Sequence, residues 1–289
     1  MTRWTLPSLN AFMARHDLDL AVTSAEAFTS GFWNQVLHLT TSHGDLVFKQ
    51  YHRTADNPLF PNLPADEARA LQRLHGLDVA PDLMGFWPDE DVLIYHYLPG
   101  PEWQDDVTAA AHLLRRQSRA DPAGFREVPT TAEAILAQAD TILALCNPDR
   151  TTEALLACRP NAQTTAATRL SLIHTDPAAA NLIGTGDSLR LIDWQCPAAG
   201  DLAEDVAVLF SAAFRTLYAR PPLTRDHRAR FLQVLGDADL TARLPALEPA
   251  YFWRLAAYCA HRMQTTPDAD LANRYSAAVL AEIACLSRS

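Results

Sequence analysis

The chain has 289 residues, of which 48% are hydrophobic and 20% are charged, as in folded globular proteins long enough to form two lobes or two modest domains. Its formal net charge of −10 argues against a general nucleic-acid binder; it is compatible with a cationic substrate, although acidic charge also serves solubility. We find no apolar signal core, no run of about 18 apolar residues, and no metal-ligand spacing among the five cysteines. We therefore expect a cytoplasmic protein with reduced thiols and no nucleic-acid or membrane partner.

The first hundred residues predict a five-stranded antiparallel sheet with one main helix. Residues 7–17 are expected to form a short leading helix capped by Ser8, and a turn containing Gly31 leads into the strand-like runs. Three of these runs are Leu46–Tyr51, Leu83–Trp87 and Val92–Tyr97. The pattern breaks at Leu98-Pro99-Gly100-Pro101. We therefore place an N-terminal lobe over residues 1–98 and a C-terminal lobe over residues 99–289.

A lysine and a glutamate in this first lobe are predicted to pair. Strand alternation places Lys49 on the same face as Val47. Glu67 lies on a predicted helix over residues 66–74 and shares the face of Leu71. A carboxylate beside an inward apolar stripe is costly unless it is paired, and Lys49 is its natural partner. The alternatives are a surface lysine at a sheet edge and a first-turn acid that favours the helix dipole.

From Gln104 onward the sequence is mainly helical. Apolar residues recur at helical spacing in two stripes, which core packing explains most simply. These stripes are Val107, Ala111 and Leu114, and then Ile135, Ala139, Ile142 and Cys146. Another helix is expected to open at Gly200–Ala207, and more are expected near residues 224–235, 247–263 and 268–286.

The most informative stretch covers residues 170–205. The apolar run Leu170–Ile173 leads into a turn with Asp176, and Asn181 follows five residues later. A second apolar run then delivers Asp193. Phosphoryl transfer from a nucleotide needs a carboxylate that accepts the proton of the attacking hydroxyl, and an Asn and an Asp that hold magnesium. Each residue alone is more often a cap or a turn residue, so the signal lies in their order and spacing.

The sequence His174-Thr175-Asp176, followed by Asn181 and by Ile192-Asp193-Trp194, resembles the aminoglycoside phosphotransferase and choline kinase-like family of small-molecule kinases. The resemblance implies an α+β, bilobal, protein-kinase-like fold with a small sheet lobe and a large helical lobe. It implies that Asp176 is the catalytic base and that Asn181 and Asp193 are Mg²⁺ ligands. His174 would support the loop, and a buried histidine in the core is its alternative.

The same resemblance assigns the nucleotide contacts of the first lobe. Lys49 would contact the phosphates while paired with Glu67. The turn at Gly31 would fold over the phosphates, although a single glycine is a weak phosphate-loop signal by itself. The backbone of His96 and Leu98 would bind the adenine edge, which explains why their side chains carry no recognisable signal.

Two acids after the central stretch are assigned support roles by the resemblance. Asp201 and Asp205 would brace the catalytic loop, and an acid favoured by the helix dipole is the alternative for Asp201. The sequence also departs from the family: Gln195 stands where many relatives carry an acid, and Pro177 directly follows the base. Because a residue before proline avoids helical geometry, Pro177 suits a base held in a loop.

The expected function is transfer of the terminal phosphoryl group of ATP, with Mg²⁺, to a hydroxyl of a small metabolite such as an amino alcohol, a sugar or an amino sugar. The alternative is a nucleotide-binding regulatory or pseudokinase module without turnover, but the intact set of expected site residues counts against it. The acceptor pocket has acidic and aromatic candidates: Glu102, Trp103, Asp105, Asp106, Trp194, Glu204 and Tyr251-Phe252-Trp253. For the last three, core packing is the simpler explanation.

Overall fold

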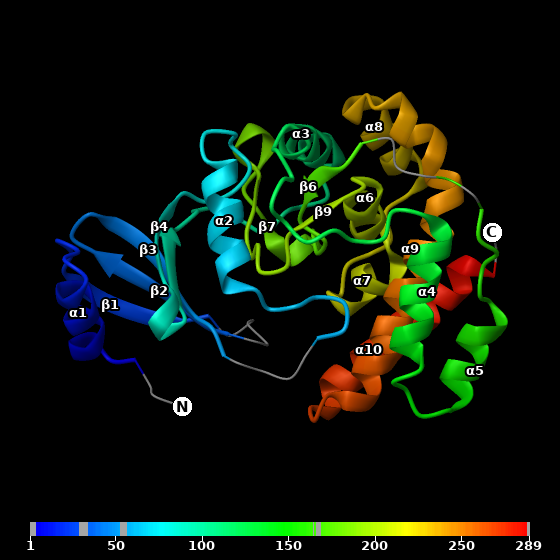
Figure 1. Ribbon diagram of the computed structural model, residues 1–289, viewed down its shortest axis with the longest axis horizontal. Helices are drawn as coiled ribbons and strands as arrows, with labels where there is room; N and C mark the ends of the chain where they lie inside the picture. The colour runs from blue at the N-terminus through cyan, green and yellow to red at the C-terminus, as the bar shows by residue number, and fades with distance from the viewer. Residues whose placement is uncertain (1–3, 29–33, 53–56, 164, 166–168, 288–289) are drawn as a thin grey trace.

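The computed structural model describes residues 4–28, 34–52, 57–163, 165 and 169–287. It has two lobes, a five-stranded antiparallel sheet with its helices and a mainly helical part that follows in sequence (Figure 1). The expectation of a bilobal α+β fold is confirmed. Within the described ranges, no helix is both long and apolar enough to cross a lipid bilayer.

The sheet of the N-lobe has the strand order β1-β2-β3-β5-β4, and each neighbouring pair is antiparallel. Its strands are β1 Val22–Ala27, β2 Gln35–Thr41, β3 Gly44–Gln50, β4 Leu83–Trp87 and β5 Val92–His96. Helix α1, Leu6–Arg15, covers one face of the sheet, where the rings of Phe12 and Phe48 lie 5.4 Å apart. Its cap is Thr5 rather than Ser8, because Ser8 is the third helical residue and completes a capping box with Thr5.

The opposite face of the sheet carries Lys49, between Val47 and Tyr51, as strand alternation predicts. Helix α2, Pro64–Leu74, begins with a proline in its first turn, where the missing N–H costs nothing. Glu67 and Leu71 of α2 are both buried, as the helical periodicity predicts. The two faces therefore differ in character, since the face under α1 is mainly apolar and the face under α2 contains the ammonium of Lys49 beside the carboxylate of Glu67.

The C-lobe is built from helices around a small group of short strands. Its helices are α3 Val107–Gln117, α4 Ala132–Leu143, α5 Arg150–Ala157, α6 Ala203–Phe210, α7 Ala212–Leu217, α8 Arg225–Leu235, α9 Ala238–Thr265 and α10 Ala269–Leu286. Its strands are β6 Ser171–Ile173, which pairs with β9 Ala198–Gly200, and β7 Leu182–Ile183, which pairs with β8 Arg190–Leu191. These two antiparallel pairs hold the stretch that carries Asp176, Asn181 and Asp193.

Helix α9 differs from the prediction because it begins at Ala238 instead of near residue 247. Two prolines, Pro245 and Pro249, lie inside it, and each removes a helical hydrogen bond. The helix forms nonetheless, capped by Asp237, and buries Leu240 and Leu244 of its first turns. Tertiary packing thus outweighs the local cost of proline.

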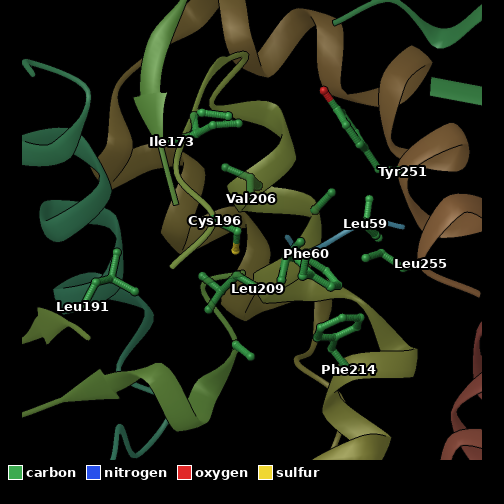
Figure 2. Packing of buried hydrophobic residues seen from close by; sticks show 14 of the residues in the cluster. Leu59, Phe60, Ile173, Leu191, Cys196, Val206, Leu209, Phe214, Tyr251 and Leu255 are labelled. Atoms are coloured by element: carbon green, nitrogen blue, oxygen red, sulfur yellow. The ribbon is translucent and has the colours of Figure 1, made fainter. Parts of the chain in front are cut away.

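One segment of the N-lobe lies in the core of the C-lobe. We call Asn57–Leu63, which leads into α2, the strap. Its residues Leu59 and Phe60 are buried in the same apolar cluster as the C-lobe helices. Figure 2 shows both side chains lying near Phe214 and Leu255, and neither belongs to the apolar cluster under α1.

Candidate active site

Lys49 lies between two carboxylates that come from different parts of the chain. Its ammonium Nζ is 2.6 Å from Glu67 Oε2 and 2.5 Å from Asp193 Oδ1. The hydroxyl of Tyr51 also donates to Glu67 Oε2, and the Lys49 ammonium lies 5.0 Å from the centre of the Tyr51 ring. Strand β3, helix α2 and the segment that follows β8 therefore meet at the ammonium group of Lys49.

The charge state of Lys49 follows from these contacts. Burial disfavours the charged ammonium, but the nearby carboxylates of Asp193 and Glu67 outweigh burial and raise the pKa of Lys49. Lys49 and Glu67 are both almost fully buried, whereas the side chain of Asp193 is 37% exposed. Asp193 is thus the partner that a ligand can reach.

The loop after β6 is held by a carboxylate of helix α6. Asp205 accepts hydrogen bonds from the backbone N–H of His174 at 2.9 Å and of Thr175 at 2.8 Å, and from Gln117 Nε2 at 2.5 Å. Thr175 has a φ of +69°, a left-handed conformation that is strained for a β-branched residue. Burial raises the pKa of Asp205 to about 7, although the three donors oppose this shift. Asp205 therefore binds two consecutive peptide groups of the loop.

His174 joins the same loop to the segment before Asp193. Its Nε2 lies 2.9 Å from the carbonyl oxygen of Ile192, and its Nδ1 accepts the backbone N–H of Asp176 at 3.3 Å. The ring packs edge-on against Trp194, with 4.5 Å between the ring centres. Burial lowers the pKa of His174 to about 4, so the imidazole is neutral near pH 7 and donates from Nε2. Its contacts are those of a supporting residue.

Asp176 and Asn181 lie at the turn between β6 and β7. The side-chain Nδ2 of Asn181 donates to the backbone oxygen of Asp176 at 2.9 Å, and the backbone oxygen of Asn181 accepts the N–H of Ile192 at 2.9 Å. Asp176 Oδ1 is buried and has no hydrogen-bond partner among the described residues. Burial, together with the charges of Asp193 and Asp205, raises the pKa of Asp176 well above its ordinary value. The turn thus carries a carboxyl group whose pKa is raised and whose Oδ1 has no hydrogen-bond partner among the described residues.

The residues present fit a magnesium ion held jointly with a nucleotide. Asn181 and Asp193 offer an amide oxygen and a carboxylate on neighbouring backbone, and Mg²⁺ prefers such oxygen ligands. Among the described residues there is no cluster of three His, Cys, Asp or Glu side chains that could hold a metal by itself. One or two protein ligands completed by phosphate oxygens and water are the usual arrangement for Mg²⁺.

The remaining nucleotide contacts are placed only in part. Gly31 lies outside the described residues. The backbone N–H of His96 donates to Asp82 O at 2.9 Å, so only its carbonyl could face an adenine edge. The N–H of Leu98 makes no hydrogen bond to another described residue, which leaves it available for a ligand. Tyr95 is buried behind this segment.

Asp201 makes its contacts away from the catalytic loop. It accepts the backbone N–H of Ala203 at 3.0 Å and pairs with Arg243 of α9. No hydrogen bond joins its side chain to residues 174–176 in the described part of the chain. Any support that Asp201 gives to the loop is therefore indirect, through the start of α6. The alternative, an acid favoured by the helix dipole, stays open for Asp201.

The acidic and aromatic candidates for the acceptor pocket are largely engaged elsewhere. Asp105 forms a two-pronged ion pair with Arg215 at 2.8 Å, and Glu204 pairs with Arg254 at 2.6 Å in the core. Glu102 pairs with Arg220 at 3.0 Å and Asp106 caps α3. Four aromatic candidates are almost completely buried: Trp103, Trp194, Tyr251 and Trp253.

Three amide side chains near the site were not predicted. Asn34 donates to Gln195 Oε1 at 3.1 Å and to Asn62 Oδ1 at 3.0 Å, and Asn62 donates back to Asn34 at 2.8 Å. Gln195 is buried, so the amide accepts this hydrogen bond without the cost of burying a carboxylate near Asp193. The departure at Gln195 was the only sequence signal for this cluster.

A tyrosine whose pKa is affected by the charge of Asp176 was also missed. Burial and then the charge of Asp176 raise the pKa of Tyr218, which lies at the end of α7 and is partly exposed. Its ring centre is 6.4 Å from that of Phe214. A single tyrosine at the end of a short helix carries no sequence pattern that would reveal this position.

Comparison with known proteins agrees with this geometry. The two-lobed fold defines the class as protein-kinase-like. The chain belongs to the phosphotransferase enzyme family, whose model matches residues 24–253. No curated protein sequence matches the chain significantly. The resemblance predicted from the central stretch is therefore confirmed.

Solved structures show the same fold at low identity. A choline/ethanolamine kinase family protein from Mesorhizobium loti is 14% identical, with a TM-score of 0.66 over 98% of this chain and 99% of that one. The choline kinase LicA from Streptococcus pneumoniae is 16% identical, with a TM-score of 0.65 over 96% and 99% of the two chains. The macrolide 2′-phosphotransferase MphH from Brachybacterium faecium is 19% identical, with a TM-score of 0.63 over 95% and 97%. A second structure of LicA is a complex with AMP.

Proposed function

We propose that this protein transfers the terminal phosphoryl group of ATP to a hydroxyl of a small metabolite. The observation that carries the proposal is the meeting of Lys49 with Glu67 and Asp193, together with a carboxylate oxygen of Asp176 that has no hydrogen-bond partner among the described residues. Such a transfer depends on positioning and on stabilising charge, and these four residues supply both.

Each residue has a role that its contacts support. Lys49, oriented by Glu67, would contact the phosphates, and Asn181 and Asp193 would hold Mg²⁺, which neutralises charge on the phosphates. Asp176 would orient the acceptor hydroxyl and take its proton, since its raised pKa makes it a better base than an exposed carboxylate. The backbone at His96 and Leu98 would bind the base of the nucleotide, and we place the division between the lobes at residues 98 and 99.

The acceptor is proposed to be small and hydroxylated. The similar structures are named for choline, ethanolamine and macrolide phosphorylation, so the fold alone admits chemically different acceptors. Because Asp105, Glu204 and Glu102 are paired with arginines, few carboxylates remain for a polycationic acceptor. We therefore favour amino alcohols and simple sugars over amino sugars with several amines.

A coupled assay of ATP consumption with Mg²⁺ over a panel of amino alcohols, sugars and amino sugars tests the proposal. We expect one acceptor class to stimulate turnover, and both chelation of Mg²⁺ and the Asp176→Ala substitution to abolish the stimulation. Tight ATP binding without stimulation by any acceptor would instead indicate a nucleotide-binding module that has no transferase activity.

A further inference from the structure

The strap, Asn57–Leu63, is anchored in the C-lobe at its first half. Asn57 Nδ2 donates to the hydroxyl of Tyr258 on α9 at 3.1 Å, and Asn57 Oδ1 accepts the N–H of Phe60 at 2.8 Å. The Phe60 ring centre lies 4.8 Å from that of Tyr258 and 5.8 Å from that of Phe214. Phe60 is 5% exposed, and Figure 2 shows its side chain near that of Phe214. A buried phenylalanine with two aromatic neighbours is a strong apolar anchor.

The second half of the strap is joined to the segment that carries Asp193. The backbone N–H of Leu63 donates to the backbone oxygen of Gln195 at 2.8 Å. Asn62 is bonded to Asn34, and Asn34 in turn donates to the side chain of Gln195 at 3.1 Å. The residue before α2 is thus fixed to a residue two positions after Asp193.

Helix α2 is tied to the C-lobe at further points along its length. Arg69 and Arg73 donate to backbone oxygens of the loop after α3, both at 2.7 Å, and lie over the ring of Phe125. After the helix, Val79 O accepts the N–H of Leu191 at 2.8 Å. Helix α2 therefore has hydrogen bonds to the C-lobe before, along and after its length, although it belongs to the N-lobe in sequence.

We propose that the strap is a positioning element that fixes Glu67 of α2 opposite Asp193, so that the two carboxylates form a preset receptor for the Lys49 ammonium. Lys49 is on the sheet, and the Lys49–Glu67 ion pair therefore joins the sheet to a helix held by the C-lobe. This inference rests on the proposed phosphoryl transfer, because it concerns the alignment of the group that would contact the phosphates.

The Phe60→Ala substitution tests the strap against a matched control. Phe231 of α8 is also a buried phenylalanine with an aromatic neighbour, Phe210 at 5.3 Å, but it lies outside the strap. We expect Phe60→Ala to lower kcat/KM for ATP and the affinity for Mg·ATP by about 10-fold or more, since small displacements of aligned groups are costly. Phe231→Ala should lower the melting temperature without a comparable loss of Mg·ATP affinity. Equal losses of Mg·ATP affinity in both variants would show that the strap only stabilises the fold, and would overturn the inference.

A double-mutant cycle shows whether the strap acts through Glu67. If it does, Phe60→Ala should have little further effect on kcat/KM in a Glu67→Gln background, whereas independent sites would give additive losses. Phe60→Leu, which retains apolar bulk, should restore most of the affinity. Asn57→Ala, which removes the hydrogen bond from the strap to Tyr258, replaces Phe60→Ala if that variant does not fold. Additive losses in the cycle refute the positioning role. Failure of the wild-type protein to turn over ATP with any acceptor refutes the proposed function instead, while the Mg·ATP affinities still test the strap.

Discussion

Asp205 Oδ1 and Oδ2 accept the backbone N–H groups of Thr175 and His174, at 2.8 Å and 2.9 Å. One carboxylate on α6 thus holds two consecutive peptide groups of the loop that presents Asp176. The left-handed conformation of Thr175 is strained, and it persists because its N–H and its hydroxyl both have partners, Asp205 and the backbone oxygen of Cys196. The position of Asp176 is therefore set by a residue that would never touch a substrate.

Replacing Asp205 should affect both stability and turnover. Asp205→Ala leaves the N–H groups of His174 and Thr175 buried without an acceptor, which should lower the free energy of unfolding by about 3 kcal/mol. Turnover should fall at least about 10-fold, because Asp176 is displaced. Asp205→Asn keeps an acceptor oxygen and should therefore lose less unfolding free energy and less turnover than Asp205→Ala. Denaturant titration and steady-state kinetics measure the two effects; an unchanged turnover in Asp205→Ala would contradict the bracing role.

The two carboxylates of the cleft should differ in what they contribute. Asp176→Ala and Asp193→Ala should each leave a folded protein whose turnover is lower by about 10² or more. Asp176→Ala should retain its affinity for Mg·ATP, since Asp176 faces the acceptor, whereas Asp193→Ala should lose affinity with its metal contact. The exposed Asp187, in the turn between β7 and β8, provides a control in Asp187→Ala. Wild-type turnover in either cleft variant would remove that residue from the mechanism.

Sequence reasoning could locate the catalytic stretch because the order and spacing of its residues carry the chemistry. The pairing of Lys49 with Glu67 followed from two periodicities that placed a lysine and a carboxylate on inward faces. The strap could not be found this way, because nothing in a proline-rich loop shows that Phe60 packs beside Tyr258, far along the chain. The early start of α9 was missed for the same reason, since burial in the tertiary structure outweighs its two prolines.

The acceptor side shows the same limit of sequence reasoning. Asp105 follows the break at Leu98-Pro99-Gly100-Pro101 and was a candidate for the acceptor pocket. In the structure Arg215 donates two hydrogen bonds to its carboxylate and neutralises its charge. Residue type reveals which side chains could bind a cation, and only the fold reveals which of them are already occupied. Tyr218, whose pKa is raised by burial and by the charge of Asp176, is the residue that the structure adds to the candidates.

Removing the ammonium of Lys49 should destabilise the fold. Lys49→Met leaves Glu67 buried without its charged partner, and breaking a buried ion pair costs about 3–5 kcal/mol. The double variant Lys49→Met/Glu67→Gln should recover much of this loss, because a neutral amide replaces the unpaired charge. Neither variant should transfer phosphate. Thermal and denaturant unfolding of the two proteins measure the difference, and equal stabilities would show that the buried carboxylate is not the cause.

A buried carboxylate away from the cleft should control how stability depends on pH. Glu282 of α10 accepts the hydroxyl of Ser211 at 2.6 Å and the N–H of Ala213 at 2.7 Å, and burial raises its pKa from 4.5 to about 7 despite these donors. Between pH 4.5 and 7 the folded state keeps a proton that the unfolded state releases, so rising pH removes stability through this group and the loss is complete above pH 7.

Glu282→Gln isolates this contribution, because its amide oxygen can still accept from Ser211 and Ala213 but does not titrate. Relative to the variant, the wild-type protein should lose up to about 3 kcal/mol of unfolding free energy as the pH rises through this window. Urea titrations of both proteins at pH 5, 6 and 7 measure the difference. If the two curves run parallel, Glu282 titrates in the folded protein as it does in the unfolded chain, and the helix contacts at Ser211 do not depend on its proton.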